Sequence, residues 1–263
     1  MAEKHMNWTS GAARRLRSLA GTPRSMEQAI SIIVSRLLQG VSCPPTDLEA
    51  IMPRLNVACC EVDADLPISG ELRKDTDGLK IVLSAHLSAT RRRWTIAHEL
   101  GHAVFETTGP NCPRYGKELE RLCEMIAREM LLPKARFLPL LEQGIDLERI
   151  SNLANIFKTS LAATAIRCAE LTGVSVFEME CKRLIWGYGV VSKGRRTGKD
   201  DEFRAAVDRA MRGESGHKVV VLTTTNQSSR WLMEWKCLGR GQRALFLLQR
   251  DGIQSKERPS SYS

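Results

Sequence analysis

The stretch RRRWTIAHELGHAVFE, residues 91–106, decides the fold around it. Two histidines, His98 and His102, stand four positions apart, and Glu99 follows the first of them. Residues four apart lie on one face of an α-helix, with Cβ atoms about 5–6 Å apart. Two imidazoles at this spacing can bind one metal ion at about 2.0–2.1 Å, which leaves the carboxylate beside the open coordination position. The motif therefore predicts a helix, over about residues 88–107, that carries a metal site.

The same histidines can also be read as ordinary core residues of a buried helix. On a helical wheel both fall within one broad apolar side of the helix. Two unpartnered imidazoles buried together are unfavourable, whereas a cation gives both a partner, so the pattern favours a metal. The apolar side consists of Trp94, Ala97, Gly101, Val104 and Phe105.

A second predicted helix, over about residues 115–132, supplies a third candidate ligand before Pro133 ends it. Glu120 falls inside the apolar stripe of this helix, and Glu124 lies at its margin. A carboxylate on a core face needs a partner, and a metal ion short of a ligand is one. The alternative is a glutamate that reaches solvent from the edge of the stripe. The stripe consists of Leu119, Leu122, Cys123, Ile126, Ala127, Met130 and Leu131.

These segments together resemble the ImmA/IrrE metallopeptidases, in which H-E-x-x-H is joined to a later E-x-x-A-N-like element that closes in L-L-M-P. The resemblance rests on residues 94–105, 120–124 and 130–133 and extends over roughly residues 25–180. It implies a zincin-like core and Zn²⁺ as the cofactor, with Glu120 as the third ligand. Glu124 departs from the pattern, because Asn or Asp usually holds its position.

The expected chemistry follows from these assignments. With His98, His102 and Glu120 as metal ligands, Glu99 is the general base that takes a proton from the attacking water and delivers it to the leaving amine. Glu124 is expected to accept a hydrogen bond from the outer ring nitrogen of a ligating histidine.

Two further residues are candidate oxyanion stabilisers. Tyr115 and His86 are near the motif in sequence and are chemically able to fill that role. No pattern in the chain selects between them.

The resemblance implies a protein substrate, in several family members a helix-turn-helix repressor whose cleavage releases genes of a stress response or mobile element. The predicted strand over residues 79–84 is expected to bind an extended substrate segment by edge pairing. A regulatory or toxin–antitoxin protein that keeps the zinc fold, and acts by binding DNA or a protein partner with little proteolysis, is the alternative. Glu99 favours the enzyme, because a pure binding protein has no need of it.

The predicted fold class is α+β, in four parts. Residues 1–24 form a disordered basic tail, and residues 25–143 form a mainly helical peptidase core with a small mixed sheet. Residues 144–182 form a helix-turn-helix-like region, which can equally be a helical lid on the peptidase. Residues 183–263 form a small basic α+β module.

The secondary-structure pattern places helices and strands within these parts. Predicted helices lie near residues 25–39, 46–55, 134–143, 146–157, 160–172 and 201–211. Predicted strands lie near residues 57–62, 68–73, 79–84, 185–191, 218–224, 231–237 and 244–249, with Asp77-Gly78 as a hairpin turn.

Composition indicates a soluble cytoplasmic protein with no membrane segment. Of the 263 residues, 43% are hydrophobic and 26% charged, as in globular domains. The eight cysteines form no C-x-x-C pair, which favours reduced thiols. A mitochondrial transit peptide would share the basic composition of the first 24 residues and stays open as a second interpretation.

The positive charge is concentrated at the C-terminal end. Residues 182–263 hold 17 Lys and Arg against 8 Asp and Glu, whereas the first 181 residues hold 22 of each sign. This net charge predicts contact with DNA or with an acidic protein partner. A solvated basic surface is the alternative, because the segment lacks zinc-finger spacing and an aromatic RNA-binding signature.

Overall fold

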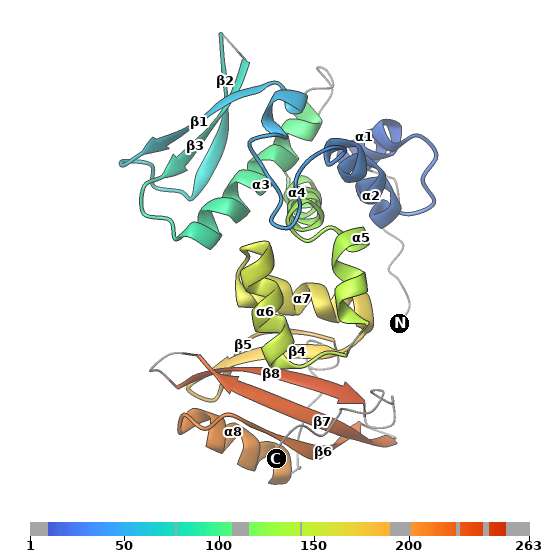
Figure 1. The fold of residues 1–263 in the computed structure, drawn as a ribbon, viewed down its shortest axis with the longest axis vertical. Helices are drawn as coiled ribbons and strands as arrows, with labels where there is room; N and C mark the ends of the chain where they lie inside the picture. The colour runs from blue at the N-terminus through green and yellow to red at the C-terminus, as the bar shows by residue number, and fades with distance from the viewer. Residues whose placement is uncertain are drawn as a thin grey trace. The chain divides into compact units, whose positions relative to one another are not determined.

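A computed structural model describes residues 10–76, 78–106, 116–142, 144–189, 201–224, 227–238 and 242–250. These residues divide into two compact units. The described residues up to Phe137, with Asn155–Ser160, form the N-terminal unit, and 138–154 with the residues from 161 onward form the C-terminal unit. Each unit combines helices with one β-sheet (Figure 1), so the predicted α+β class is confirmed.

The sheet of the N-terminal unit has three strands in the order β1-β3-β2. β1 (Val57–Asp63) runs parallel to β3 (Gly78–Ser84), and β2 (Gly70–Asp75) pairs with β3 in the antiparallel sense. The three predicted strands and the hairpin are confirmed, although Asp77 itself lies outside the described residues. Because β3 is the central strand, the prediction that it receives a substrate at its edge is wrong. In the described part of this sheet, the free edges belong to β1 and β2.

One helix packs on this sheet and a second helix packs on the first, and both were expected from the sequence. α3 (Ala89–Glu106) contacts β2, β3 and α4 (Lys117–Leu131). All seven residues of the predicted apolar stripe on α4 are buried. α3 therefore lies between the sheet and α4, so side chains on its remaining face can meet residues from both.

The predicted disordered tail is wrong for the residues that form α1 (Gly11–Ala20). Ser10 caps this helix by accepting a hydrogen bond from the Ala13 N–H at 3.0 Å. α1 contacts α2 (Met26–Leu37), α3 and α4. The many arginines suggested a solvated tail, but a narrow apolar face is enough to pack the helix. That face consists of Ala12, Ala13, Leu16 and Ala20.

The helix predicted over residues 46–55 is reduced to one 3-10 turn, η1 (Met52–Leu55). Asp47 Oδ1 accepts hydrogen bonds from the backbone N–H groups of Glu49 and Ala50, at 3.1 and 3.2 Å, and so favours a turn at that point. Pro53 has no N–H to donate to a continuing helix. The helix predicted over residues 134–143 is likewise divided, into α5 (Lys134–Phe137) and η2 (Leu138–Leu141).

The C-terminal unit is built on a five-stranded antiparallel sheet in the order β5-β4-β8-β7-β6. Four of its strands were predicted. β4 was not, and since β4 pairs with both β5 and β8, the predicted domain boundary at residue 183 cuts through the sheet and is wrong. The strands are β4 (Ser175–Glu180), β5 (Arg183–Tyr188), β6 (Gly216–Thr224), β7 (Gln227–Cys237) and β8 (Arg243–Arg250).

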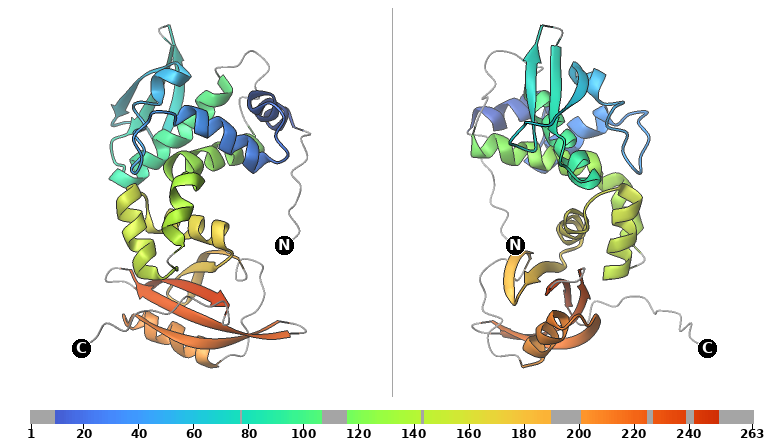
Figure 2. Two further views of the ribbon diagram at one scale, coloured as in Figure 1. Left: turned by 45° about the vertical axis from the view of Figure 1, so that its right-hand side comes forward. Right: turned by 90° about the vertical axis from the view of Figure 1, so that its left-hand side faces the viewer.

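α8 (Asp201–Met211) covers one face of this sheet (Figure 2). The rings of Phe177 and Phe246 stack at 4.7 Å between centroids within the core. Trp235, also in this core, is fully buried, and its Nε1 donates a hydrogen bond to the Glu214 carbonyl at 2.8 Å. The unit thus has a hydrophobic core of its own.

α6 (Leu147–Phe157) and α7 (Leu161–Thr172) occupy the predicted helix-turn-helix-like positions. Of the twelve residues of α7, only Thr172 is exposed. Arg167, the one basic residue of α7, is 8% exposed and pairs with Glu170 at 3.4 Å. A DNA-recognition helix needs several exposed polar or basic side chains to contact base edges and phosphates, and α7 offers only Thr172 at its C-terminal end.

A membrane-spanning helix is absent from the described residues, because none of their helices is both long and apolar enough to cross a bilayer.

Candidate metal centre

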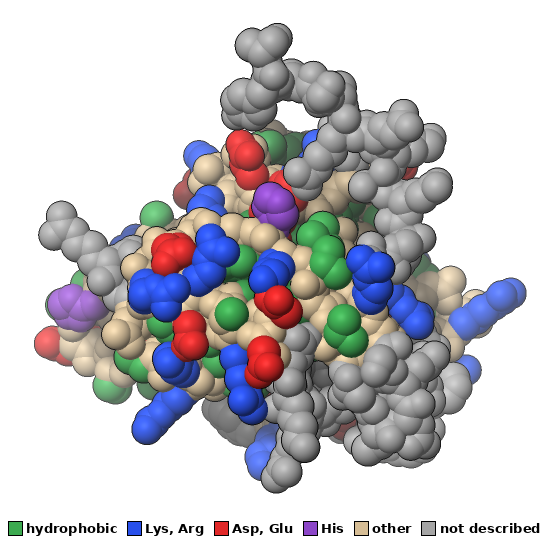
Figure 3. All heavy atoms as spheres, turned by 90° about the horizontal axis from the view of Figure 1, so that it is seen from below, with side chains coloured by type: hydrophobic (Ala, Val, Ile, Leu, Met, Phe, Trp, Pro, Cys, Tyr) green, Lys and Arg blue, Asp and Glu red, His purple; other side chains and the backbone are tan. Residues whose placement is uncertain are grey.

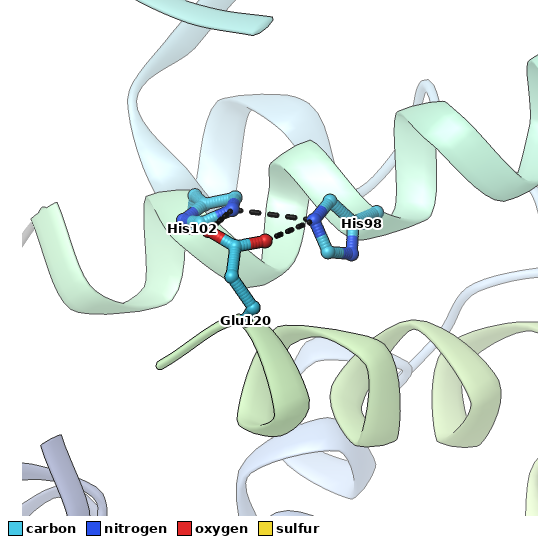
Figure 4. A group of neighbouring side chains, drawn as sticks. All are labelled: His98, His102 and Glu120. Carbon is cyan, nitrogen blue, oxygen red and sulfur yellow. Dashed lines mark hydrogen bonds and ion pairs between the residues drawn. The ribbon is translucent and has the colours of Figure 1, made fainter. Parts of the chain in front are cut away.

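The H-E-x-x-H motif lies in the middle of α3, where one helical turn separates its two histidines. The Nε2 atoms of His98 and His102 face each other at 3.3 Å, and each side chain is 18% exposed (Figure 4). Both imidazoles thus turn the same nitrogen toward one point, as the four-residue spacing predicts.

α4 contributes the third member of the group. Glu120 Oε2 lies 3.2 Å from His98 Nε2, and Glu120 Oε1 lies 3.5 Å from His102 Nε2. The Glu120 side chain is 48% exposed, so it stands at the solvent edge of α4 and not on the core face that the helical wheel suggests. It reaches the histidines from the first turn of its helix.

A close crossing of α3 and α4 brings Glu120 to this position. A Cβ added at Gly101 would lie 3.0 Å from both the Cα and the carbonyl oxygen of Cys123. Those are backbone atoms, which cannot turn aside as a side chain can. A glycine at position 101 therefore lets the two helix backbones approach closely enough for one carboxylate to meet both imidazoles.

The three side chains fit a divalent metal ion. Two ligand atoms at about 2.0–2.1 Å from a tetrahedral ion lie about 3.3–3.4 Å apart, and the three observed separations are 3.2, 3.3 and 3.5 Å. Two histidines and one carboxylate are the protein ligands of many catalytic zinc sites. Within the described ranges, His98, His102 and Glu120 are the one group of three or more such residues close enough to share an ion.

Glu99 lines the same pocket as this group but is not one of its members. Its side chain is 6% exposed, and it accepts a hydrogen bond from the backbone N–H of Leu72 on β2. Burial raises the pKa of Glu99 to about 7, with a further contribution from the negative charge of Glu120, while the Leu72 N–H acts in the opposite direction. A carboxyl with this pKa can both accept and release a proton near neutral pH.

The group opens into a pocket of about 680 Å³. Its lining residues come mainly from β2, α3 and the first two turns of α4. The lining is mixed, with carboxylates, two basic side chains and apolar residues. The lining residues are Ile68, Ser69, Gly70, Glu71, Leu72, Lys74, Leu79, Arg91, Trp94, Thr95, His98, Glu99, His102, Glu120 and Glu124.

The remaining predicted site residues are placed differently. Glu124 lines the pocket and is exposed, but the buried Nδ1 of His98 has no hydrogen-bond partner among the described residues. Glu124 is therefore not seen to hold that histidine. His86 is exposed in the turn after β3 and is not among the residues that line the pocket, and Tyr115 lies outside the described residues.

Sequence reasoning missed the contribution of β2. Leu72 acts through its backbone N–H, which any non-proline residue carries, so no residue type marks it. The available signal was the hairpin, since an edge strand next to the motif helix is a natural neighbour for Glu99.

α3 carries two histidines and a buried glutamate, and α4 adds a carboxylate. This arrangement places the chain in the class of proteins with an H-E-x-x-H candidate metal centre. Residues 54–169 match the family model of the IrrE N-terminal-like domain, Peptidase_M78. These residues are therefore similar to the domain of this peptidase family, and the resemblance seen in the sequence is confirmed. The match begins within η1 and ends within α7.

Comparison with curated proteins found no match. Among solved structures, a Mycobacterium tuberculosis transcriptional regulator matches with a TM-score of 0.46 at 15% sequence identity. The match covers 94% of this chain and 79% of that chain. So distant a likeness assigns no function.

Proposed function

We propose that this protein is a zinc-dependent endopeptidase that cuts a protein partner at a defined site. The observation that carries the proposal is the placement of Glu99, which is buried next to His98, His102 and Glu120 but is not part of that group. A metal site that only stabilises the fold has no use for a buried carboxylate beside it. The match to a peptidase family supports the same activity.

His98, His102 and Glu120 would hold the ion, and Glu99 would move the proton. When bound, a zinc ion supplies Lewis acidity, which polarises a peptide carbonyl and lowers the pKa of water. Glu99 accepts the proton of the attacking water and transfers it to the nitrogen of the leaving amine, so the amine departs uncharged. The low exposure of Glu99 keeps bulk water from competing for that proton.

β2 is the strand that offers the substrate an edge. It borders the pocket, and in the described residues it pairs on one side only, with β3. An extended segment can add to such an edge through main-chain hydrogen bonds. Because the substrate segment must be extended, cleavage is favoured in a loop or an unfolded segment of the partner. The enzyme is then selective for sites where such a segment exists.

We further propose that the partner is a helix-turn-helix transcriptional repressor, cleaved in a stress or mobile-element response, and that the protein works in the cytoplasm. The support is the family relationship. Direct DNA binding by this chain has weaker support, because α7 has no exposed basic side chain.

The charge of the C-terminal unit also fits a protein partner better than DNA. On the face seen in Figure 3, Lys and Arg are interspersed with Asp and Glu. Several basic side chains of this unit form ion pairs, among them Lys182 with Asp208 at 2.7 Å and Arg209 with Glu214 at 2.8 Å. A regulator without proteolysis, which acts by binding DNA, is therefore the less favoured function.

The test compares wild-type protein with Glu99→Gln on candidate repressors and on a lysate of the source cells, with new protein N-termini identified by mass spectrometry. Glu99→Gln preserves shape and should keep the metal while cleavage falls by about 10²-fold or more, the usual size of general-base catalysis. Equal cleavage by the two proteins at equal metal content would contradict the proposal. Glu118→Gln, a change on α4 outside the pocket lining, is the matched control.

A further inference from the structure

β2 approaches α3 closely at Gly70, where the strand begins. A Cβ added at Gly70 would lie 2.5 Å from Thr95 Cγ2, 3.0 Å from Leu83 Cδ2 and 3.1 Å from the Val82 carbonyl oxygen. Separations under 3.0 Å are far inside van der Waals contact, so a side chain at this position would push the strand and the helix apart. The approach is possible because residue 70 has no side chain.

Thr95 is fixed in the orientation that makes this contact. Its Oγ1 donates a hydrogen bond to the Arg91 carbonyl oxygen one turn earlier, at 3.0 Å, and the residue is 4% exposed. A threonine whose hydroxyl is held in this way has a restricted χ1. Its methyl group therefore cannot rotate away from Gly70 unless that hydrogen bond breaks.

The close approach has a consequence two residues further along β2. Gly70 and Leu72 pair with Leu83 and Ile81 of β3, so they share one face of the sheet, the face toward α3. The Leu72 N–H donates to the Glu99 carboxylate at this point. The spacing between strand and helix at Gly70 therefore sets how well that N–H can reach Glu99.

We propose that Gly70 is a positioning residue. Together with Thr95 it lets β2 pack closely on α3, and this close packing (the seating of β2) holds Glu99 through the Leu72 N–H. The effect on catalysis rests on the proposed function, whereas the seating itself does not. Neither residue belongs to the group of candidate ligands, so we expect the two to act on the geometry of the base and of the strand edge.

Four variants of the full chain test this: Gly70→Ala, Thr95→Ser, the double variant, and Arg73→Ala as a control on the opposite face of β2. Thr95→Ser removes the methyl group that would clash but keeps the hydroxyl. Gly70→Ala should lower kcat by about 10–100-fold, the usual loss for a misplacement near 1 Å. The double variant should recover most of this loss when it is compared with Thr95→Ser alone, and Arg73→Ala should stay near wild type.

Two readouts do not depend on cleavage. Hydrogen exchange of the Leu72 amide, followed by NMR, should accelerate in Gly70→Ala and slow again in the double variant, and zinc content should be the same in all. An unchanged exchange rate of the Leu72 amide in Gly70→Ala, or a double variant that recovers nothing, would overturn the proposal.

If Gly70→Ala fails to fold, the double variant must restore folding and a protected Leu72 amide, and failure to do so also overturns the proposal. If the wild type cleaves nothing, the proposed function fails while the Leu72 amide still decides the seating.

Discussion

Glu120 and Glu124 stand one turn apart on α4, and only Glu120 meets the histidines. Both carboxylates line the same pocket and both are exposed, so neither charge nor burial separates them. The separation is geometric, since Glu120 lies within 3.2 and 3.5 Å of the two Nε2 atoms. The position of a carboxylate along α4, which differs by one helical turn between the two residues, therefore decides which of them can bind the metal.

Replacement of each carboxylate by its amide tests this assignment. Glu120→Gln should weaken zinc affinity severely, because it removes the anionic ligand. Glu124→Gln should lower zinc affinity by at most about 10–100-fold, which is the loss expected when an outer hydrogen-bond partner is removed. Competition with a chromogenic chelator measures both affinities. A larger loss for Glu124→Gln than for Glu120→Gln would reverse the assignment.

Much of the candidate site was predictable residue by residue. The spacing of His98 and His102 determines a shared helix face, so the pair follows from sequence alone. Glu120 followed from the resemblance, while the helical wheel misplaced it in the core, because a wheel cannot show that a neighbouring helix leaves the first turn of α4 open to solvent. Gly70 and Leu72 were out of reach, since their roles depend on how closely a separate strand packs on α3.

The crossing of α3 and α4 is the element-scale feature on which the ligand set depends. Gly101 allows the backbones to approach at Cys123, and the same approach brings Glu120 across to the histidines. A change at Gly101 should therefore affect metal binding although residue 101 is not a ligand.

Gly101→Ala should destabilise the protein by about 1–3 kcal/mol, the usual cost of overpacking, and should also weaken zinc binding. The double variant Gly101→Ala/Cys123→Ala should recover little, because the three obstructing atoms are the Cα, the carbonyl oxygen and the Cβ of residue 123, and alanine keeps all three. Thermal unfolding and chelator competition measure the two effects, with Cys123→Ala alone as the matched control. Full zinc affinity in Gly101→Ala would show that the crossing does not set the ligand geometry.

Two elements escaped prediction for identifiable physical reasons. β4 is flanked by strands on both sides, and Ser175–Glu178 are all buried, so it lacks the alternation that marks a half-exposed strand. A glutamate at position 178 suggests a surface residue from sequence alone. In the structure Glu178 is buried, because Trp186 Nε1 donates a hydrogen bond to its carboxylate and Arg243 forms an ion pair with it. α1 was hidden by its arginines, which surround a face of mostly small apolar residues.

At the scale of the whole molecule, the chain consists of two units, and the candidate metal centre belongs entirely to the N-terminal one. The sequence predicted a basic C-terminal module but placed its boundary inside a sheet, because strand pairing across a boundary leaves no trace in local composition. The five-stranded sheet and α8 give the C-terminal unit a core that does not involve the metal ligands.

Metal removal should accordingly act on one unit. A ligand present at about 100 times its Kd stabilises the native state by about 2.7 kcal/mol. A chelator should therefore lower the unfolding temperature of the N-terminal unit by about 5–10 °C and leave the C-terminal transition in place. Scanning calorimetry checks this, with His102→Ala as a control that should not respond to chelator. An equal shift of both transitions would contradict the separation.

X-ray absorption at the zinc edge tests most directly the central claim that His98, His102 and Glu120 bind a divalent ion. The chain holds eight cysteines, and the seven in the described residues are free thiols, so a sulfur-bound zinc is the real competitor. We predict about one zinc per chain with only nitrogen and oxygen ligands, near 2.0–2.1 Å, and the outer-shell signal of two imidazoles. A sulfur shell near 2.3 Å, or purified protein without stoichiometric metal, would contradict the claim.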